Sequence, residues 1–196
     1  MLKVIDNFLP LQLQEDLKQT CLGMSFPWYY IPDVTRSVFV EGDYAQPGFH
    51  HTPFNEYKPQ SQYFDYFKFL SFFIINEIKY EDPLHLFRIR AGLNVATADH
   101  NKLFDQEHNF PHIDHNPEIV DCKTFTCLYY VNDSDGDTFV FDQTQESDNY
   151  TIKKRVTPKQ GRLFIFDGEQ FHASSSPEKS SSRVVLTYNY HAKRVI

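Results

Sequence analysis

The stretch Thr124-Phe-Thr-Cys-Leu-Tyr-Tyr-Val131, followed directly by Asn132-Asp-Ser-Asp-Gly136, sets the pattern of the C-terminal half of the chain. Its first eight residues are mostly β-branched or aromatic, and these residue types favour strands. The next five residues tolerate tight backbone turns. The stretch therefore predicts a strand that is followed by a hairpin-like reversal.

Segments of the same character lie on both sides of this stretch. Strands are predicted at Leu86–Val95, Thr138–Phe141, Thr151–Val156, Arg162–Asp167 and Arg183–Tyr190. Pro158-Lys-Gln-Gly161 predicts a second hairpin-like reversal between two of them. We therefore expect residues 85–191 to form an all-β core.

Two helices are predicted before these strands. Leucines at helical spacing and a stop at Gly23 favour a helix at Leu11–Cys21. Gln60–Lys79 contains no Gly or Pro and repeats apolar residues every three or four positions, which favours a long packed helix. The segment 26–53 is aromatic and interrupted by Pro, so we expect it to be mostly irregular.

Helices followed by many short strands are typical of an α+β protein in which helices support a β-sandwich or jelly roll. The chain has 196 residues, of which 41% are hydrophobic, and this is enough for one sizeable core. We therefore expect a single, mainly β domain over residues 1–196, with residues 1–84 as its helical N-terminal support.

Charge and apolar content limit the expected partners. The net charge of −7 argues against nucleic acid, because phosphate binding usually needs a basic face. The apolar run Phe69–Ile75 is far shorter than the about 20 residues that cross a bilayer, and the N-terminus lacks a signal-peptide pattern. Cys21, Cys122 and Cys127 lack the paired spacing of a zinc site and are expected to be reduced thiols. We expect a cytoplasmic protein without a membrane partner.

The candidate metal ligands begin with His112 and Asp114, which are two residues apart. On an extended segment both side chains leave the same face and can meet one ion, whereas His115 points the other way. His172 follows a predicted strand and opens a loop of small residues. Two imidazoles and one carboxylate form the facial triad of non-haem Fe(II). The alternative is a turn whose polar groups are solvated.

Arg183 begins the last predicted strand. A guanidinium group inside a sheet needs a carboxylate partner, because burying an unpaired charge is costly. Its planar fork suits the distal end of a dicarboxylate. The alternative is an exposed arginine at the edge of a strand.

Together these motifs resemble the Fe(II)- and 2-oxoglutarate-dependent oxygenases, and within them the prolyl 4-hydroxylase-like branch. The matching residues are His112-x-Asp114, Leu128-Tyr-Tyr-Val-Asn132, Asp135-Gly-Asp-Thr-Phe139, Gly161-Arg-Leu-Phe-Ile-Phe166, His172 and Arg183. Val4-Ile-Asp-Asn-Phe-Leu-Pro10 also looks like the start of many small members. The resemblance covers roughly residues 86–190 and implies that they form a double-stranded β-helix, a jelly-roll catalytic core.

The resemblance also implies a role for each matching residue. His112, Asp114 and His172 are expected to bind Fe(II). Arg183 is expected to pair with the far carboxylate of 2-oxoglutarate. Tyr130 corresponds to a position whose phenol commonly assists that carboxylate.

Strand alternation adds further candidates. Leu128 and Thr187 share strand faces with the two co-substrate residues, so each either lines the co-substrate site or is ordinary core. Arg88, Arg90 and Asn94 share one strand face. If that face is inward, Asn94 belongs to the co-substrate site and Arg90 reaches the substrate. The alternative is a solvated strand face.

Two features depart from the family pattern and bear on the substrate. Asp137 follows Gly136 where a second Gly is common, and Ala96–Pro111 is longer and more polar than a minimal connection. Ser174–Ser182 is expected to be a flexible loop that borders the site. The remaining histidines expected to be solvated or locally hydrogen-bonded are His50, His51, His100 and His108.

The resemblance implies oxidative decarboxylation of 2-oxoglutarate to succinate and CO2, coupled to hydroxylation of a C–H bond. Fe(II), 2-oxoglutarate and O2 are required, with ascorbate as a supporting reductant. The expected substrate is a prolyl or other amino-acid side chain in a protein or peptide. Two alternatives stay open: the same chemistry on a free small molecule or nucleobase, and a non-catalytic jelly-roll module that binds metal for recognition.

Overall fold

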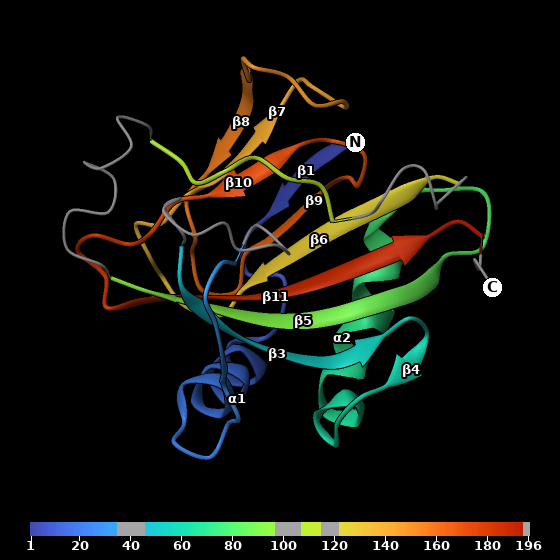
Figure 1. Ribbon diagram of the computed structural model, residues 1–196. Coiled ribbons are helices and arrows are strands. Elements are labelled where there is room, and N and C mark those ends of the chain that lie inside the picture. The colour runs from blue at the N-terminus through green and yellow to red at the C-terminus, as the bar shows by residue number, and fades with distance from the viewer. Residues whose placement is uncertain (35–45, 97–106, 115–121, 194–196) are drawn as a thin grey trace.

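The computed structural model describes residues 1–34, 46–96, 107–114 and 122–193, and within these ranges the chain forms two antiparallel β-sheets and two helices (Figure 1). The large sheet has the order β1-β9-β6-β11-β5-β3-β2, with β4 paired to β3, and the small sheet has the order β10-β7-β8. The strands of the large sheet are β1 (Leu2–Ile5), β2 (Tyr29–Ile31), β3 (Gly48–Asn55), β4 (Lys58–Pro59), β5 (His85–Val95), β6 (Thr124–Tyr130), β9 (Leu163–Asp167) and β11 (Ser182–His191). Those of the small sheet are β7 (Thr138–Phe141), β8 (Ile152–Val156) and β10 (His172–Ser174).

Alternation along the central strands gives the large sheet two apolar faces. On β6, Cys127 and Tyr129 pack into the cluster that contains the helices, whereas Leu128 and Tyr130 pack toward the small sheet. Strands β9 and β11 divide their residues between the two sides in the same way. The side-chain period of two therefore builds a helix layer on one face and a second sheet on the other.

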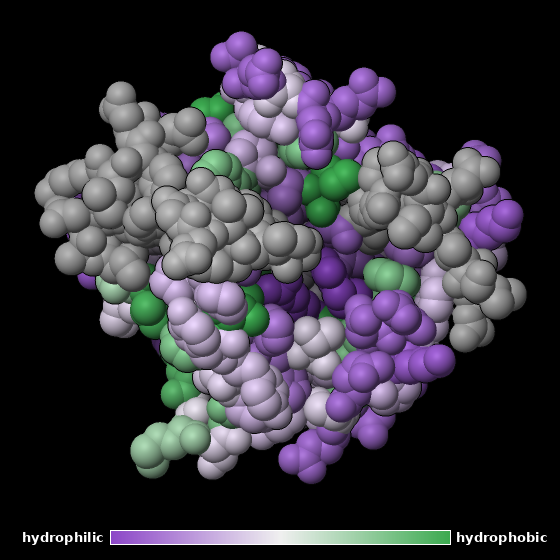
Figure 2. Space-filling view, viewed as in Figure 1, coloured by the Kyte–Doolittle hydropathy of each residue, from purple (hydrophilic) through white to green (hydrophobic). Residues whose placement is uncertain are grey.

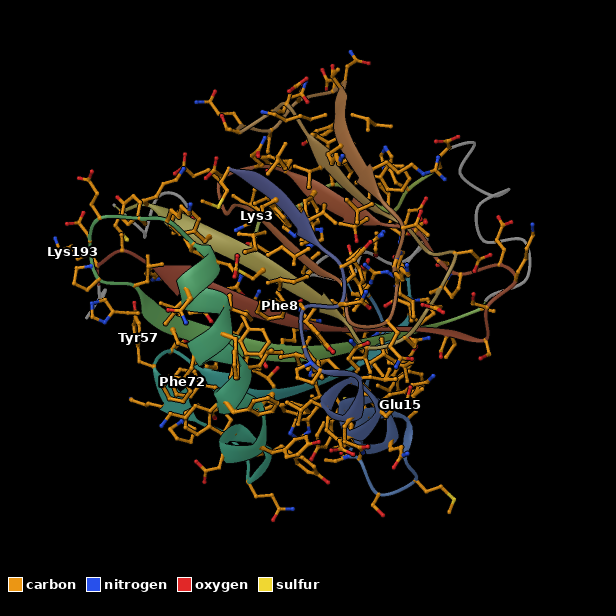
Figure 3. The ribbon with its side chains drawn as sticks, turned by 180° about the vertical axis from the view of Figure 1, so that it is seen from behind. Lys3, Phe8, Glu15, Tyr57, Phe72 and Lys193 are labelled. Carbon is orange, nitrogen blue, oxygen red and sulfur yellow. The ribbon has the colours of Figure 1, made fainter. Side chains whose placement is uncertain are left out.

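The helices cover one face of the large sheet, as the rear view shows (Figure 3). Helix α1 (Leu11–Leu22) and helix α2 (Tyr63–Glu77) confirm the two predicted helices. Helix α2 begins later than expected: Lys58–Pro59 still pair with β3, and the backbone N–H of Gln60 donates to the carbonyl of Pro53, 2.8 Å away. Fully buried Phe67 and Leu70 dock the helix, and each such burial contributes about 1.5–3 kcal/mol.

Neither of the two predicted reversals forms a hairpin, because the strands that flank each turn lie in different sheets. Residues 132–136 connect β6 in the large sheet to β7 in the small sheet, and residues 158–161 connect β8 back to β9. Strand β6 already pairs with β9 and β11 on its two edges, so the next strand has no edge to join there. Turn residues reverse the chain, but they do not determine which sheet receives the next strand.

The expectation that segment 26–53 is mostly irregular is also wrong for its described residues. Strands β2 and β3 extend the large sheet, with β3 paired to β5. Pro53 lies where the β3–β5 register shifts, and a bulge tolerates a residue without an N–H. Residues 35–45 of this segment lie outside the described part of the chain.

No helix in the described ranges has the length and apolar character that would let it cross a membrane.

Candidate active site

His112 and His172 are brought together by their own backbones. Each residue's N–H donates to the other's carbonyl at 2.9 Å, in an isolated antiparallel bridge. The two imidazole centroids lie 4.5 Å apart. His172 was expected to open a loop, but it begins the short strand β10, whose pairing with β7 fixes its position.

Asp114 completes the cluster from the same segment as His112. Its Oδ2 lies 3.8 Å from His172 Nε2. One ligand atom from each of the three residues lies within 4.8 Å of the others. The geometry favours a metal site over a solvated turn. A donor set of two imidazoles and one carboxylate fits Fe(II), because three sites on one side of the ion leave others open.

The hydrogen bonds of the two imidazoles leave the Nε2 nitrogens of His112 and His172 available to a metal. His112 Nδ1 lies 3.3 Å from the carbonyl of Phe110, and His172 Nδ1 lies 3.2 Å from the carbonyl of Gln170. A carbonyl only accepts, so Nδ1 carries the proton and Nε2 presents a lone pair. Burial and the neighbouring His172 lower the pKa of His112 to about 4, and burial also lowers the pKa of His172. Both rings are therefore neutral at pH 7, as metal ligands must be.

Two further side chains hold the Asp114 carboxylate. Arg88 Nη2 donates to Oδ1 at 2.7 Å, and Asn189 Nδ2 donates to Oδ2 at 3.0 Å. Arg88 also donates to the Asn189 side chain at 2.9 Å, which joins β5 and β11 beneath the carboxylate. Neither residue was predicted to serve the metal site. Alternation along the last strand could have indicated Asn189, since its side chain leaves the same face as that of Arg183.

Arg183 is buried on the inner face of β11, and this excludes the alternative of an exposed edge arginine. Its Nε donates to the carbonyl of Gly136 and its Nη2 to Thr138 Oγ1, both at 2.8 Å. None of the described carboxylates forms an ion pair with it, and burial lowers its pKa. A Cβ at Gly136 would meet Arg183 Cδ at 3.0 Å and the carbonyl of Ser175 at 2.7 Å, so only glycine leaves room.

These residues surround an inner cavity of about 100 Å³ between the two sheets. Among the candidates from strand alternation, Leu128, Thr187 and Asn94 all line it. Asn94 Nδ2 is buried and has no hydrogen-bond partner among the described residues. An unpaired donor and an unpaired cation facing one cavity fit an anionic ligand such as a dicarboxylate. The complete lining is Val34, Phe49, Arg88, Arg90, Gly92, Asn94, His112, Asp114, Leu128, Thr138, His172, Ala173, Ser174, Arg183, Val185 and Thr187.

Tyr130 does not line this cavity. Its hydroxyl donates to Thr138 Oγ1 at 2.8 Å, and the same oxygen accepts from Arg183. Burial raises the pKa of Tyr130, so the phenol stays protonated. Thr138 thus stands between the phenol and the cavity, a position that sequence reasoning missed because Thr138 lies on a different sheet.

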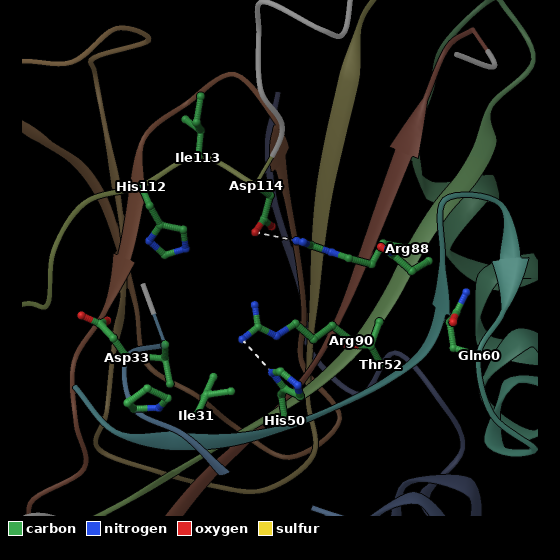
Figure 4. Close-up of a pocket in the computed structure, with 13 residues that line it drawn as sticks. Ile31, Asp33, His50, Thr52, Gln60, Arg88, Arg90, His112, Ile113 and Asp114 are labelled. Atoms are coloured by element: carbon green, nitrogen blue, oxygen red, sulfur yellow. Dashed lines mark hydrogen bonds and ion pairs between the residues drawn. The ribbon is translucent and has the colours of Figure 1, made fainter. Parts of the chain in front are cut away.

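A second, outer cavity of about 700 Å³ opens beside the metal ligands (Figure 4). Arg88, Arg90, His112 and Asp114 line both cavities, so they form the boundary between them. The outer wall comes mainly from β2, β3 and the residues that follow them. In Figure 2 strongly hydrophilic side chains fill the hollow at the centre of this face. The other residues of the lining are Ile31, Pro32, Asp33, Val34, His50, Thr52, Asn55, Gln60 and Ile113.

His50 was expected to be solvated or locally hydrogen-bonded in a loop. It lies instead on β3, lines the outer cavity and faces Arg90 across 3.5 Å. The alternative of a solvated strand face for Arg88 and Arg90 is thereby excluded. His108 hydrogen-bonds to the carbonyl of the neighbouring Asn109, as expected. His51 does not lie in a loop: it is buried on β3 and hydrogen-bonds to the carbonyl of Pro27 and the hydroxyl of Ser61. His100 lies outside the described residues.

The departures from the family pattern lie beside the site. Asp137 is buried and forms an ion pair with Arg155 of β8. Segment 174–182 is tied to the body of the protein, because Asp135 accepts the backbone N–H of Lys179 at 2.7 Å and of Ser180 at 3.0 Å. Residues 97–106 of the long connection lie outside the described part of the chain.

Comparisons with known proteins agree with this geometry. Residues 100–191 match the model of the 2OG-Fe(II) oxygenase superfamily. No curated protein sequence matches the chain significantly. The jelly-roll fold and the resemblance to this superfamily, both expected from the sequence, are confirmed.

Three solved structures illustrate how widely this fold is shared. An oxidoreductase of the 2OG-Fe(II) oxygenase family from Burkholderia pseudomallei has a TM-score of 0.66 and 11% identity, over 99% of this chain and 86% of that one. A prolyl hydroxylase from Trichoplax adhaerens, in complex with a hypoxia inducible factor peptide, has a TM-score of 0.63 and 16% identity, over 97% and 83%. The epimerase SnoN from nogalamycin biosynthesis has a TM-score of 0.63 and 11% identity, over 97% and 78%.

Proposed function

We propose, from the premise that residues 100–191 match the 2OG-Fe(II) oxygenase superfamily, that this protein is a hydroxylase that uses Fe(II), 2-oxoglutarate and O2. In the proposed reaction, a substrate C–H bond, 2-oxoglutarate and O2 become an alcohol, succinate and CO2. One oxygen atom of O2 enters the alcohol and the other enters succinate, so atoms and electrons balance. The proposed substrate is a prolyl or other amino-acid side chain in a protein or peptide.

This proposal rests on one observation: a set of metal ligands and a buried cation, each of which lacks its partner, line the same cavity. His112, Asp114 and His172 offer three ligand atoms within 4.8 Å of one another, which could hold one metal ion. Arg183 offers a buried cation without a carboxylate partner among the described residues. A dicarboxylate that chelates a metal at one end and reaches Arg183 at the other satisfies both.

The side chains around Arg183 orient that far carboxylate. Thr138 Oγ1 accepts hydrogen bonds from Arg183 and Tyr130, which occupy its two lone pairs and leave its own proton to donate. Asn94 Nδ2 is a further unpaired donor on the same wall. We infer that Tyr130 acts through Thr138 and is a positioning residue.

Bound Fe(II) and 2-oxoglutarate supply the oxidising chemistry. The chain's own contribution is to hold the ligand set, orient the co-substrate and exclude water from the inner cavity. Arg88 and Asn189 hold the Asp114 carboxylate in one orientation. The outer cavity brings a substrate to the opposite side of the same ligands.

A peptide substrate draws support from structural neighbours that are prolyl hydroxylases, including the Trichoplax adhaerens protein and a prolyl-4-hydroxylase from Pseudomonas putida. A free small molecule is the second candidate. Its support is the outer cavity of about 700 Å³, a size usual for small-molecule sites, and the likeness of the fold to an epimerase of antibiotic biosynthesis.

The test has a binding arm and a turnover arm. In the binding arm, the protein is titrated anaerobically with Fe(II) and 2-oxoglutarate, and the visible charge-transfer absorption of the chelate is followed. In the turnover arm, prolyl peptides, free amino acids and small-molecule candidates are incubated with both and O2, and mass spectrometry looks for the gain of one oxygen atom.

We expect the absorption to appear in the wild type and to be lost in His112→Ala. A wild-type protein that binds the metal but not 2-oxoglutarate would favour a non-catalytic recognition module. Products from free small molecules alone would replace the peptide substrate by the second candidate.

A further inference from the structure

Arg90 is the cation of the outer cavity that the metal site does not explain. It lies on β5, two residues after Arg88, and its side chain lines both cavities. Arg88 is paired with Asp114, whereas Arg90 forms no ion pair with any described carboxylate. In Figure 4 its guanidinium reaches into the middle of the pocket, between Asp114 and His50.

His50 faces Arg90 but does not neutralise its charge. Arg90 Nη2 and His50 Nδ1 lie 3.5 Å apart. Burial, and then the charge of Arg90, lower the pKa of His50, so the imidazole is neutral and its nitrogen can only accept here. A guanidinium stays protonated in proteins, so the positive charge of Arg90 remains unbalanced by this neighbour.

The carboxylates of the same cavity are committed elsewhere. Asp114 is bound by Arg88 and Asn189 and belongs to the candidate metal ligands. Asp33 is buried, has an interaction of its own, and its carboxylate points away from Arg90 in Figure 4. Burial lowers the pKa of Arg90, which marks the desolvation that an anionic partner would offset.

We propose that Arg90, supported by His50, binds a carboxylate of the substrate, so that the hydroxylated molecule is an acid. The inference rests on the proposed oxygenase function and names its substrate class. The planar fork of Arg90 suits two carboxylate oxygens, and Thr52 and Asn55 on β3 offer polar groups along the same wall.

The position of Arg90 limits where this carboxylate can be. Arg90 lines the same two cavities as His112 and Asp114, so an anion held by it lies next to the metal ligands. The oxidised carbon must therefore be only a few bonds from the carboxylate. A free α-carboxylate, in an amino acid or at a peptide C-terminus, and the side chain of an adjacent Asp or Glu both satisfy this condition.

The test uses matched acid and amide probes. N-acetylproline is compared with N-acetylprolinamide, and a prolyl peptide with an adjacent Glu is compared with its Gln counterpart. A wider panel of free amino acids is compared with their amides. Each probe is added to the protein with Fe(II) and 2-oxoglutarate. Binding is read anaerobically from the change in the charge-transfer absorption, and turnover from succinate formation.

Three variants separate the role of Arg90 from general effects. Arg90→Gln removes the charge, Arg90→Lys keeps it, and Lys154→Gln removes an exposed charge on β8 at a residue that lines neither cavity. We expect the wild type to prefer at least one acid over its amide by roughly 10- to 150-fold, the range for a charge-assisted pair. Arg90→Gln should abolish this preference, Arg90→Lys should retain part of it, and Lys154→Gln should leave it unchanged.

The outcomes distinguish this inference from the proposed function. If the protein binds Fe(II) and 2-oxoglutarate but no acid is preferred over its amide, the carboxylate site is wrong and the oxygenase proposal stands. If Arg90→Gln weakens 2-oxoglutarate binding more than about tenfold without any probe, Arg90 serves the co-substrate, and the inference is overturned. If the wild type binds neither Fe(II) nor 2-oxoglutarate, the proposed function itself is overturned.

Discussion

The inner and outer cavities share five residues, Val34, Arg88, Arg90, His112 and Asp114, yet they are built differently. Around the part of the inner cavity that the outer cavity does not share, hydrogen bonds are short: 2.8 Å from Arg183 to both Gly136 and Thr138, and 2.8 Å from Tyr130 to Thr138. On the outer wall the contacts are long: 3.5 Å from Arg90 to His50, 3.4 Å from Asn55 to Glu56 and 3.5 Å from Gln60 to Lys58.

This difference separates a fixed site from an adaptable one. Buried side chains with short mutual hydrogen bonds keep one geometry, which suits a metal and a co-substrate that never change. Partly buried side chains with long contacts can form new hydrogen bonds with an incoming ligand at little cost. The side chains of the inner cavity therefore indicate the reaction class, and those of the outer cavity indicate the substrate.

Removal of a metal ligand should give the largest effect. His172→Ala keeps the backbone bridge to His112 but removes one of the three ligand atoms. We expect metal affinity to fall more than about 100-fold, since even the partners of metal ligands are worth about 10- to 100-fold. Isothermal titration with Fe(II) under anaerobic conditions measures it.

The matched control is His108→Ala, which removes a histidine that is outside the ligand cluster. It should bind metal as the wild type does. Equal metal affinity in His172→Ala and the wild type, with both folded by circular dichroism, would remove His172 from the ligand set.

Arg183→Gln should weaken the binding of 2-oxoglutarate in the inner cavity without weakening the binding of the metal. The charge-assisted contact with a dicarboxylate is lost, and such contacts are worth about 1.5–3 kcal/mol, or roughly 10- to 150-fold in affinity. Anaerobic titration of the Fe(II)-loaded protein with 2-oxoglutarate measures this. Arg162→Gln, which removes the surface pair with Asp6, should leave the affinity unchanged. An unchanged value in Arg183→Gln would contradict its assignment.

Arg88→Gln should weaken the metal site by a smaller factor. It leaves the three ligands in place but removes the 2.7 Å contact that fixes the Asp114 carboxylate. The expected loss of Fe(II) affinity is about 10- to 100-fold. Should Arg88→Gln bind Fe(II) as tightly as the wild type while losing substrate turnover, Arg88 would belong to the outer cavity instead.

Asn55→Ala on the outer wall should give the smallest effect. Asn55 has one long contact, with Glu56, and the loss of a single neutral hydrogen bond to a ligand costs about 0.5–1.5 kcal/mol. We expect KM for an active substrate to rise roughly 2- to 12-fold, with Fe(II) and 2-oxoglutarate affinities unchanged. A change in either of those affinities would show that the two cavities are not separable.

The difference between the cavities also marks how far sequence reasoning reached. His112, Asp114, His172 and Arg183 could be singled out because spacing, strand alternation and the motifs around them are local signals. Strand parity also placed Leu128, Thr187 and Asn94 correctly on the inner cavity. His50 and Thr138 were missed as site residues. Each lies on a strand, β3 or β7, whose pairing partner could not be derived from the sequence of that strand.

The sequence by itself determined the alternating strands of residues 85–191, the two helices and the residue types that a metal and a dicarboxylate require. Only the tertiary structure decided that the backbones of His112 and His172 pair, that Arg88 and Asn189 grip Asp114, and that β3 places His50 against Arg90. Periodicity records which face a side chain takes along its own strand. Which strands become neighbours depends on hydrogen bonding and packing between distant segments, and these are properties of the whole fold.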